Sequence, residues 1–199
     1  MTEPKTLLQM AGAPLSPPRL RDAALLVVDA QGEYRDGKLP LDGIDAALDR
    51  VAELLARARA AGATVIHVAH RGRPGSLFDR DAAGGAILAR AAAAPGEAVV
   101  EKGLPNAFAG TDLEARLTQA GRRDIVLAGF MTHMCVSSTA RAALDFGYRV
   151  TVAADATATR TLPDPMGGAP VPATELQRAA LAELADRFAI VVPAASIPA

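Results

Sequence analysis

The sequence predicts an α/β fold in which helices cover both faces of a six-stranded, parallel and doubly wound sheet. Short apolar runs alternate along the chain with longer segments of helical period, which is typical of parallel strands joined by helices. Glycines follow three of the helical segments, at Gly62, Gly121 and Gly147, where they can end a helix. Because the connections are short and such crossovers are right-handed, six strands of this kind would form one doubly wound sheet.

The first half of the chain contains three of the predicted strands. In order, the predicted elements are a strand at 24–29, a helix at 42–61, a strand at 64–69, an Ala-rich helix that ends before Pro95, and a strand at 98–102. The long helix has one apolar stripe, formed by Ile44, Leu48, Val51, Leu55 and Ala58. Asp42 is its predicted N-cap, because a carboxylate oxygen can accept from the first free N–H groups of a helix.

The second half contains the other three strands. In order, the predicted elements are a short helix from Thr111 to Gly121, a strand at 124–129, a helix from about Cys135 to Phe146, a strand at 149–153, a last helix, and a strand at 190–192. Thr111 and Glu114 have the spacing of a capping box. Thr174 and Gln177 open the last helix, whose apolar stripe consists of Leu176, Leu181, Leu184 and Phe188.

Length and charge limit the possible classes of protein. The chain has 199 residues, with 21 Lys and Arg against 22 Asp and Glu, so we predict one domain, 1–199, without a basic field for nucleic acid or a membrane surface. No apolar run reaches the roughly 18 residues of a membrane-spanning helix. Residues 1–22 include Pro14, Pro17 and Pro18, lack the apolar stretch of a secretory signal, and are predicted to form an extended arm. One cysteine excludes an internal disulfide, which predicts a reducing, cytoplasmic location.

Three residues with reactive side chains lie at or near the ends of predicted strands. Asp29 ends the first strand, Lys102 ends the third, and Cys135 follows the fourth, in the first turn of a predicted helix. Ligands of doubly wound sheets bind at the carboxyl ends of the strands, and a helix start favours a thiolate over a thiol. We therefore expect a nucleophilic site in which Asp29 takes the proton, Lys102 holds the charges and Cys135 attacks.

Each of these residues also has an ordinary structural interpretation. A lone cysteine is often a small buried apolar residue, and an aspartate or lysine at a strand end is often a solvated boundary residue. The joint appearance of all three at strand ends is what favours the catalytic hypothesis.

Three segments resemble motifs of one enzyme family, the isochorismatase-like cysteine hydrolases, which include nicotinamidases, N-carbamoylsarcosine amidases and isochorismatases. The family's nucleophile segment is similar to GFMTHMCVSSTARAALDFGYRVTVAADATAT. Its first-strand motif is similar to VVDAQGEY, and its lysine segment to EKGLPNAFAGTDLEARL. The resemblance spans about residues 24–192 and implies a three-layer sandwich with the Rossmann-like strand order 3-2-1-4-5-6.

The resemblance also implies roles for individual residues. Asp29 matches the general base, Lys102 the family's lysine and Cys135 the nucleophile. The Phe130–Met131 peptide matches a bond that the family holds in the cis form. The N–H groups of Met131 and Cys135 would then form the oxyanion hole.

Further residues are predicted to border the substrate. They are Gln31, Tyr34, His70, Phe108, Thr132 and His133. Tyr34 and Phe108 match positions that line the pocket in the family, and His70 ends the second strand. His133 is also a rival to Asp29 as the base, although a side chain two positions from the nucleophile has poor reach to the sulfur.

The three histidines raise the question of a metal site. In the nicotinamidase branch of the family, an Asp-Trp-His segment and a later histidine hold a metal. The corresponding stretch here, HVAHRGRPGSLFDRD, has no such triplet, so we predict no metal and no other cofactor. His67 is predicted to be a hydrogen-bonded residue within a strand. The Gly/Pro-rich loops 71–76 and 163–172 have the composition of surface turns, with lids or subunit contacts as alternatives.

These observations lead to three functional hypotheses. The first is a metal-free cysteine hydrolase that cleaves a C–N bond of a small amide through a thioester acyl-enzyme. The second is a vinyl ether hydrolase of the isochorismatase type, in which the aspartate acts as the acid and Cys135 is idle. The third is a non-catalytic binding or scaffold protein that retains the fold. The resemblance further implies a homo-oligomer, a dimer or larger, with a small-molecule substrate as the other partner.

Overall fold

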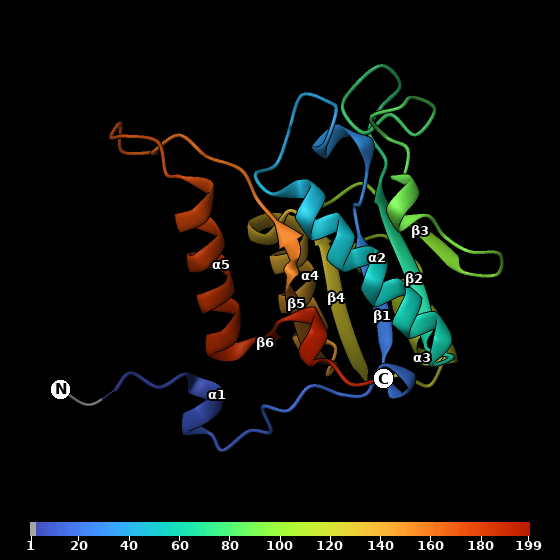
Figure 1. Cartoon of the computed structure of the whole chain (residues 1–199), viewed down its shortest axis with the longest axis vertical. Coiled ribbons are helices and arrows are strands. Elements are labelled where there is room, and N and C mark those ends of the chain that lie inside the picture. The colour runs from blue at the N-terminus through green and yellow to red at the C-terminus, as the bar shows by residue number, and fades with distance from the viewer. Residues whose placement is uncertain (1–2) are drawn as a thin grey trace.

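The computed structural model describes residues 3–199 and has a six-stranded sheet at its centre (Figure 1). The strand order is β3-β2-β1-β4-β5-β6, and all neighbouring strands are parallel. The strands are β1 (Ala24–Val28), β2 (Thr64–His70), β3 (Ala98–Lys102), β4 (Asp124–Phe130), β5 (Arg149–Ala158) and β6 (Ile190–Val192). The predicted fold class and strand order are therefore confirmed.

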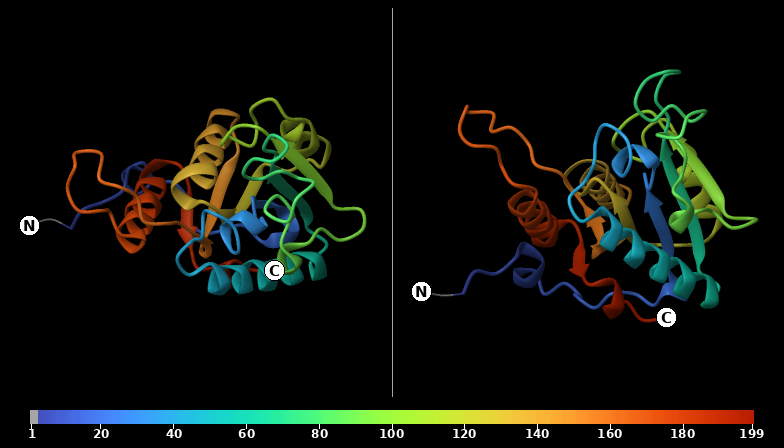
Figure 2. Two further views of the ribbon diagram at one scale, coloured as in Figure 1. Left: turned by 90° about the horizontal axis from the view of Figure 1, so that it is seen from above. Right: turned by 45° about the horizontal axis from the view of Figure 1, so that its top comes forward.

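Helices cover both faces of this sheet (Figure 2). The helices on the sheet are α2 (Ile44–Ala60), α3 (Leu113–Gln119), α4 (Ser137–Asp145) and α5 (Ala173–Arg187), whereas the short α1 (Leu7–Met10) lies against α5. Buried side chains of α2 belong to the apolar core on one face, and those of α3, α4 and α5 belong to the core on the other.

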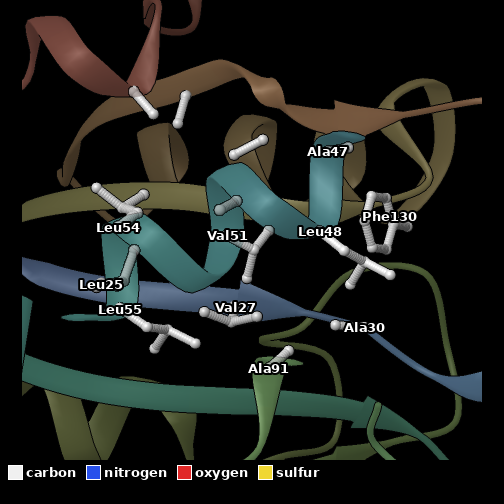
Figure 3. Close-up of a cluster of buried hydrophobic side chains, with 14 of the residues drawn as sticks. Leu25, Val27, Ala30, Ala47, Leu48, Val51, Leu54, Leu55, Ala91 and Phe130 are labelled. Atoms are coloured by element: carbon white, nitrogen blue, oxygen red, sulfur yellow. The ribbon is translucent and has the colours of Figure 1, made fainter. Parts of the chain in front are cut away.

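The central strand β1 contributes to both cores. Leu25 and Val27 lie in the cluster that α2 covers (Figure 3), whereas Leu26 and Val28 lie in the cluster on the opposite face. This alternation follows from the two-residue period of a strand. Because every residue of β1 is buried, the position of Asp29 at its end is fixed from both faces.

The Ala-rich segment before Pro95 does not form the predicted helix. It consists of turns and one short 3₁₀ helix, Ala89–Ala91. Ile87 forms an antiparallel bridge with Gln31, and the N–H of the next residue donates to the Ala30 carbonyl oxygen at 2.8 Å. These tertiary hydrogen bonds draw the segment along the end of β1 and outweigh the helix propensity of alanine.

Two of the predicted helix caps are also wrong. α2 begins after Gly43, and the Asp42 N–H donates to the Thr159 carbonyl oxygen, so contacts with β5 determine where the helix starts. α3 begins after Asp112 without a side-chain cap. The Thr111 hydroxyl donates to the Ala107 carbonyl oxygen at 2.6 Å and accepts from the Leu113 N–H at 3.3 Å, rather than from the Glu114 N–H that the predicted capping box requires.

The N-terminal arm is partly helical rather than extended throughout. Thr6 closes a capping box on α1, and the Leu7 N–H donates to the Asp186 carboxylate of α5 at 2.8 Å. α5 itself begins at Ala173, one residue before the predicted Thr174, and has no side-chain cap. Within residues 3–199, no helix has both the length and the apolar character that crossing a membrane requires.

Candidate active site

Three strand ends bring Asp29, Lys102 and Cys135 together. The carboxyl ends of β1, β3 and β4 lie along one edge of the sheet (Figure 1). Asp29 directly follows β1 and has a left-handed backbone conformation, with φ of 49°. Its N–H donates to the Val68 carbonyl oxygen at 2.8 Å, which holds this turn against β2. Residues other than glycine are uncommon in this region of backbone space, and they gather at functional sites.

The Lys102 ammonium joins the other two residues of the triad. Its Nζ lies 2.7 Å from Asp29 Oδ2 and 3.3 Å from Cys135 Sγ. The exposed fractions are 0% for Asp29, 2% for Lys102 and 4% for Cys135. A buried charge is costly unless it is paired, so the aspartate and the lysine each require the other in the folded protein.

Burial keeps the Cys135 thiol protonated at rest. Burial, reinforced by the Asp29 carboxylate and opposed by Lys102, raises the pKa of Cys135 to about 12. Desolvation therefore acts against the thiolate that the start of a helix is expected to favour. Burial also raises the pKa of Asp29 above its ordinary value, although Lys102 opposes this change. A carboxylate with a raised pKa is a better proton acceptor, which suits Asp29 to the role of base.

A π-helical turn, Thr132–Val136, positions Cys135 after β4. The predicted single helix at 135–146 is thus this turn followed by α4. The last N–H of the turn donates to the Met131 carbonyl oxygen at 3.2 Å, with the five-residue spacing of a π-helix. The preceding Phe130–Met131 peptide is cis, in agreement with the resemblance.

Two side chains of this turn bind the end of β5. The Thr132 hydroxyl donates to the Ala158 carbonyl oxygen at 3.0 Å, and His133 Nδ1 forms a hydrogen bond with the Thr159 hydroxyl. His133 therefore faces β5, and the contact of Lys102 with both Asp29 and Cys135 favours Asp29 as the base.

Gly129 lets β4 lie very close to β1 beside the site. Its φ is 114°, and a Cβ atom at this position would lie 2.0 Å from the Val28 carbonyl oxygen. A side chain here would push β4 away from the residue that precedes Asp29. The spacing of the two strands that lead to Asp29 and Cys135 therefore depends on this glycine.

A cavity of about 590 Å³ opens beside Cys135. Its apolar wall includes Tyr34, Phe78 and Met131, and its basic residues are Arg71, Arg73 and Arg160. This volume suits a small molecule. A cavity of about 560 Å³ between α2, β5 and α5 contains none of the triad residues, so the cavity beside Cys135 is the candidate substrate site.

Only part of the predicted substrate border lines this cavity. Tyr34 and His70 do, whereas Gln31, Phe108, Thr132 and His133 lie outside the lining in the described part of the chain. Gln31 is fully buried, its Oε1 accepts from the His70 N–H at 2.8 Å, and its Nε2 donates to the His70 carbonyl oxygen at 2.9 Å. Phe108 stacks on Phe146 with ring centroids 5.0 Å apart. Gln31 and Phe108 therefore support the fold around the site instead of lining the cavity.

No sequence pattern marks Phe78, which lies in the loop after β2. Arg160 follows the end of β5 by two residues. Because ligands of doubly wound sheets bind at the carboxyl ends of the strands, the argument that selected Asp29 would also select Arg160. The prediction that this strand stops at residue 153 placed its end too early, because β5 continues to Ala158 past an irregularity in its pairing with β4.

The three histidines have three separate surroundings. His67 Nε2 lies 2.9 Å from Glu97 Oε2, which confirms the prediction of a hydrogen-bonded histidine within a strand. His70 Nδ1 lies 3.4 Å from Lys102 Nζ, and His133 lies against β5. Between residues 3 and 199, no three His, Cys, Asp or Glu side chains form a group that could hold a metal ion.

Comparisons with known proteins identify the family of this fold. A model of the isochorismatase domain matches residues 23–196. The chain is 40% identical to the secreted isochorismatase effector Isc1 of Verticillium dahliae over 94% of this chain and 96% of that protein. It is 34% identical to maleamate amidohydrolase of Pseudomonas putida over 66% of this chain and 70% of that protein. The fold is similar to that in a crystal structure of an isochorismatase from Pseudomonas putida, with a TM-score of 0.93. The two chains are 40% identical, and the match covers 98% of this chain and 100% of that one. The chain therefore belongs to the isochorismatase family of hydrolases.

Proposed function

We propose that this protein hydrolyses the C–N bond of a small amide through a thioester on Cys135. The observation that carries this proposal is the position of Lys102 Nζ, 2.7 Å from Asp29 Oδ2 and 3.3 Å from Cys135 Sγ, at a cavity of about 590 Å³. A thiol, a carboxylate with raised pKa and a cation that contacts both are the groups that acyl transfer requires.

The acylation steps follow from these groups. Asp29 accepts the thiol proton as the sulfur attacks the carbonyl carbon. The N–H groups of Met131 and Cys135 stabilise the tetrahedral oxyanion; such a donor contributes about 3–4 kcal/mol. Asp29 then gives its proton to the departing amine, and the C–N bond breaks to leave the thioester.

Hydrolysis of the thioester reverses the roles. Asp29, again a carboxylate, takes a proton from a water molecule that attacks the thioester carbonyl carbon. The C–S bond breaks, the acid product leaves, and the proton returns to the sulfur. Lys102 keeps its proton throughout and stabilises the charge that moves between Asp29 and Cys135.

Removal of the thiol tests this proposal. Replacement of Cys135 by Ala is expected to abolish turnover of a panel of small amides, and Cys135→Ser to leave only a weak residual activity. The wild-type protein, quenched in acid during turnover, should show one added acyl group by whole-protein mass spectrometry. Because the chain has one cysteine, the site of a thiol adduct is unambiguous. Undiminished amide hydrolysis by Cys135→Ala would contradict the acyl-enzyme.

Arg160 indicates the class of substrate. It lines the cavity, its buried Nε has no hydrogen-bond partner, and its guanidinium has no carboxylate partner among residues 3–199. A half-buried cation with no counterion favours an anionic ligand, and arginine matches a carboxylate well. The substrate in this proposal is therefore an amide that also carries a carboxylate; maleamate, from which one relative takes its name, is a compound of this class.

Arg160→Met separates charged from neutral substrates. Hydrogen bonds to charged groups contribute about 1.5–3 kcal/mol, so KM for carboxylate-bearing amides is expected to rise about 10- to 100-fold. KM for neutral amides should change little. Arg50→Met, on the exposed side of α2, is the matched control for loss of one positive charge. An equal rise of KM for both substrate classes would contradict recognition of a carboxylate by Arg160.

The isochorismatase name of Isc1 supports a second candidate function, hydrolysis of a vinyl ether. That reaction needs Asp29 as an acid and has no use for the thiol, so Cys135→Ala would retain it while losing amide hydrolysis. A homo-oligomeric assembly and a cytoplasmic location stay predictions, and Isc1 is by name a secreted protein.

A further inference from the structure

Three acceptors surround the Lys102 ammonium, which has three N–H groups to donate. Two of them belong to the triad, Asp29 Oδ2 at 2.7 Å and Cys135 Sγ at 3.3 Å. The third is His70 Nδ1, at 3.4 Å. His70 and Lys102 pair in the register of β2 and β3, and paired residues of neighbouring strands point to the same face of the sheet.

This contact defines the state of the His70 ring. An ammonium group can only donate, so Nδ1 must carry the lone pair and the proton of the neutral ring must lie on Nε2. His70 also lines the substrate cavity. The ring therefore has one nitrogen engaged with the triad lysine and a second that can act as a donor.

The surroundings hold His70 in this orientation. The buried Gln31 amide binds both the N–H and the carbonyl oxygen of the His70 backbone, at 2.8 and 2.9 Å. The Phe78 ring meets the imidazole edge to face, with centroids 5.3 Å apart. Backbone and ring are thus both constrained, as the support of a precise site requires.

We propose that His70 is a positioning residue for the chemistry at Cys135. Its Nδ1 accepts the third N–H of Lys102 and so keeps the ammonium between Asp29 and Cys135, and its Nε2–H remains to donate to the substrate. This inference rests on the proposed function, because it assigns His70 a part in the same thiol reaction.

Protonation of His70 would disable this arrangement. The charged groups that face the ring are Lys102 from β3 and Asp29 after β1, and the cations Arg71 and Arg73 line the same cavity. Burial and Lys102 lower the pKa of His70 below 6.5, so the ring is neutral at neutral pH. An imidazolium would lose the Nδ1 acceptor and repel the lysine. As the pH falls, the reaction should therefore slow through His70 as well as through protonation of Asp29.

The test uses alkylation of the single cysteine, which needs no knowledge of the substrate. The rate of reaction of the folded protein with iodoacetamide is measured from pH 4 to 8 by whole-protein mass spectrometry, with Asp29→Asn as the baseline without the base. His70→Asn keeps an acceptor at the δ position but cannot titrate, whereas His70→Leu has no acceptor. Circular dichroism confirms that each variant is folded.

We plot the logarithm of the alkylation rate against pH. At the acid end, the slope is expected to be two for the wild type, because both Asp29 and His70 take up a proton, and one for His70→Asn. His70→Leu should react about 10- to 100-fold more slowly than His70→Asn near neutral pH, the usual effect of losing a supporting contact. A slope of two in His70→Asn, or equal rates for the Asn and Leu variants, would overturn the inference alone. A wild-type rate no higher than that of Asp29→Asn would overturn both it and the proposed function. If His70→Leu does not fold, the slope in His70→Asn decides.

Discussion

Asp29→Asn is expected to lower kcat for amide hydrolysis by about 10²- to 10⁴-fold, the contribution typical of a general base. The asparagine keeps the size of the side chain but cannot accept the thiol proton, and burial leaves that thiol with a pKa of about 12. The kcat/KM of the wild type should fall on the acid side as Asp29 is protonated. Since burial raises the pKa of Asp29, this limb should lie above pH 3.8, the ordinary value of an aspartate.

A competing explanation of the same loss predicts the opposite change at the sulfur. The Asp29 carboxylate raises the pKa of Cys135. If this electrostatic effect were the whole role of Asp29, replacement by Asn would lower the pKa of Cys135 and the thiol would react faster. A general base instead predicts slower alkylation of Cys135 in Asp29→Asn. The rate of iodoacetamide labelling in the two proteins therefore distinguishes the roles, and faster labelling of the variant would contradict the base.

The parts of the site that lie on strands could be predicted from the sequence. Asp29 and Lys102 each end a predicted strand, and the topology of a doubly wound sheet brings such ends to one edge. Short apolar runs and the 3.6-residue period also identified strands and helices that pack on both faces. These patterns are local, and burial of the sheet enforces them.

Features that depend on tertiary contacts could not be predicted in this way. The Ala-rich segment before Pro95 bonds to the end of β1, and Asp42 bonds to β5, so both depart from their local propensity. Burial of Cys135, which raises the pKa of its thiol, likewise follows from tertiary packing. The lining of the cavity includes loops such as the one that carries Phe78, whose sequence has no periodic pattern of apolar residues.

Gln31 shows how a motif residue can have a role other than the one its place suggests. It lies two residues after Asp29, and from the sequence it is expected to border the substrate. In the structure its amide binds the backbone of His70, and the His70 ring in turn contacts Lys102. Its effect on the reaction would therefore pass through the triad lysine rather than through substrate contact.

Lys102→Met is expected to have the largest effect on stability, because it leaves the fully buried Asp29 carboxylate without its cation. Breaking a buried ion pair by removal of one partner costs about 3–5 kcal/mol. Asp29 can escape this cost by taking up a proton, and its pKa in the folded variant should lie well above the 3.8 of the unfolded chain. The folded state then binds more protons than the unfolded state, so the free energy of unfolding is highest at low pH. It should fall by up to about 1.4 kcal/mol per pH unit as the pH rises from 3.8 through the folded pKa.

Urea unfolding of Lys102→Met at pH 5 and pH 8 measures this dependence. The double variant Asp29→Asn/Lys102→Met is the matched control, because it has no buried charge at these two positions and is expected to regain most of the lost stability with little dependence on pH. Both variants should be inactive, since neither retains the Lys102 contact with Cys135. A single variant as stable as the wild type at pH 8, or one that gains stability as the pH rises, would show that Lys102 does not neutralise Asp29 in the folded protein. Recovery of stability without recovery of activity in the double variant is the result expected if this buried pair is retained for chemistry at Cys135 rather than for the fold.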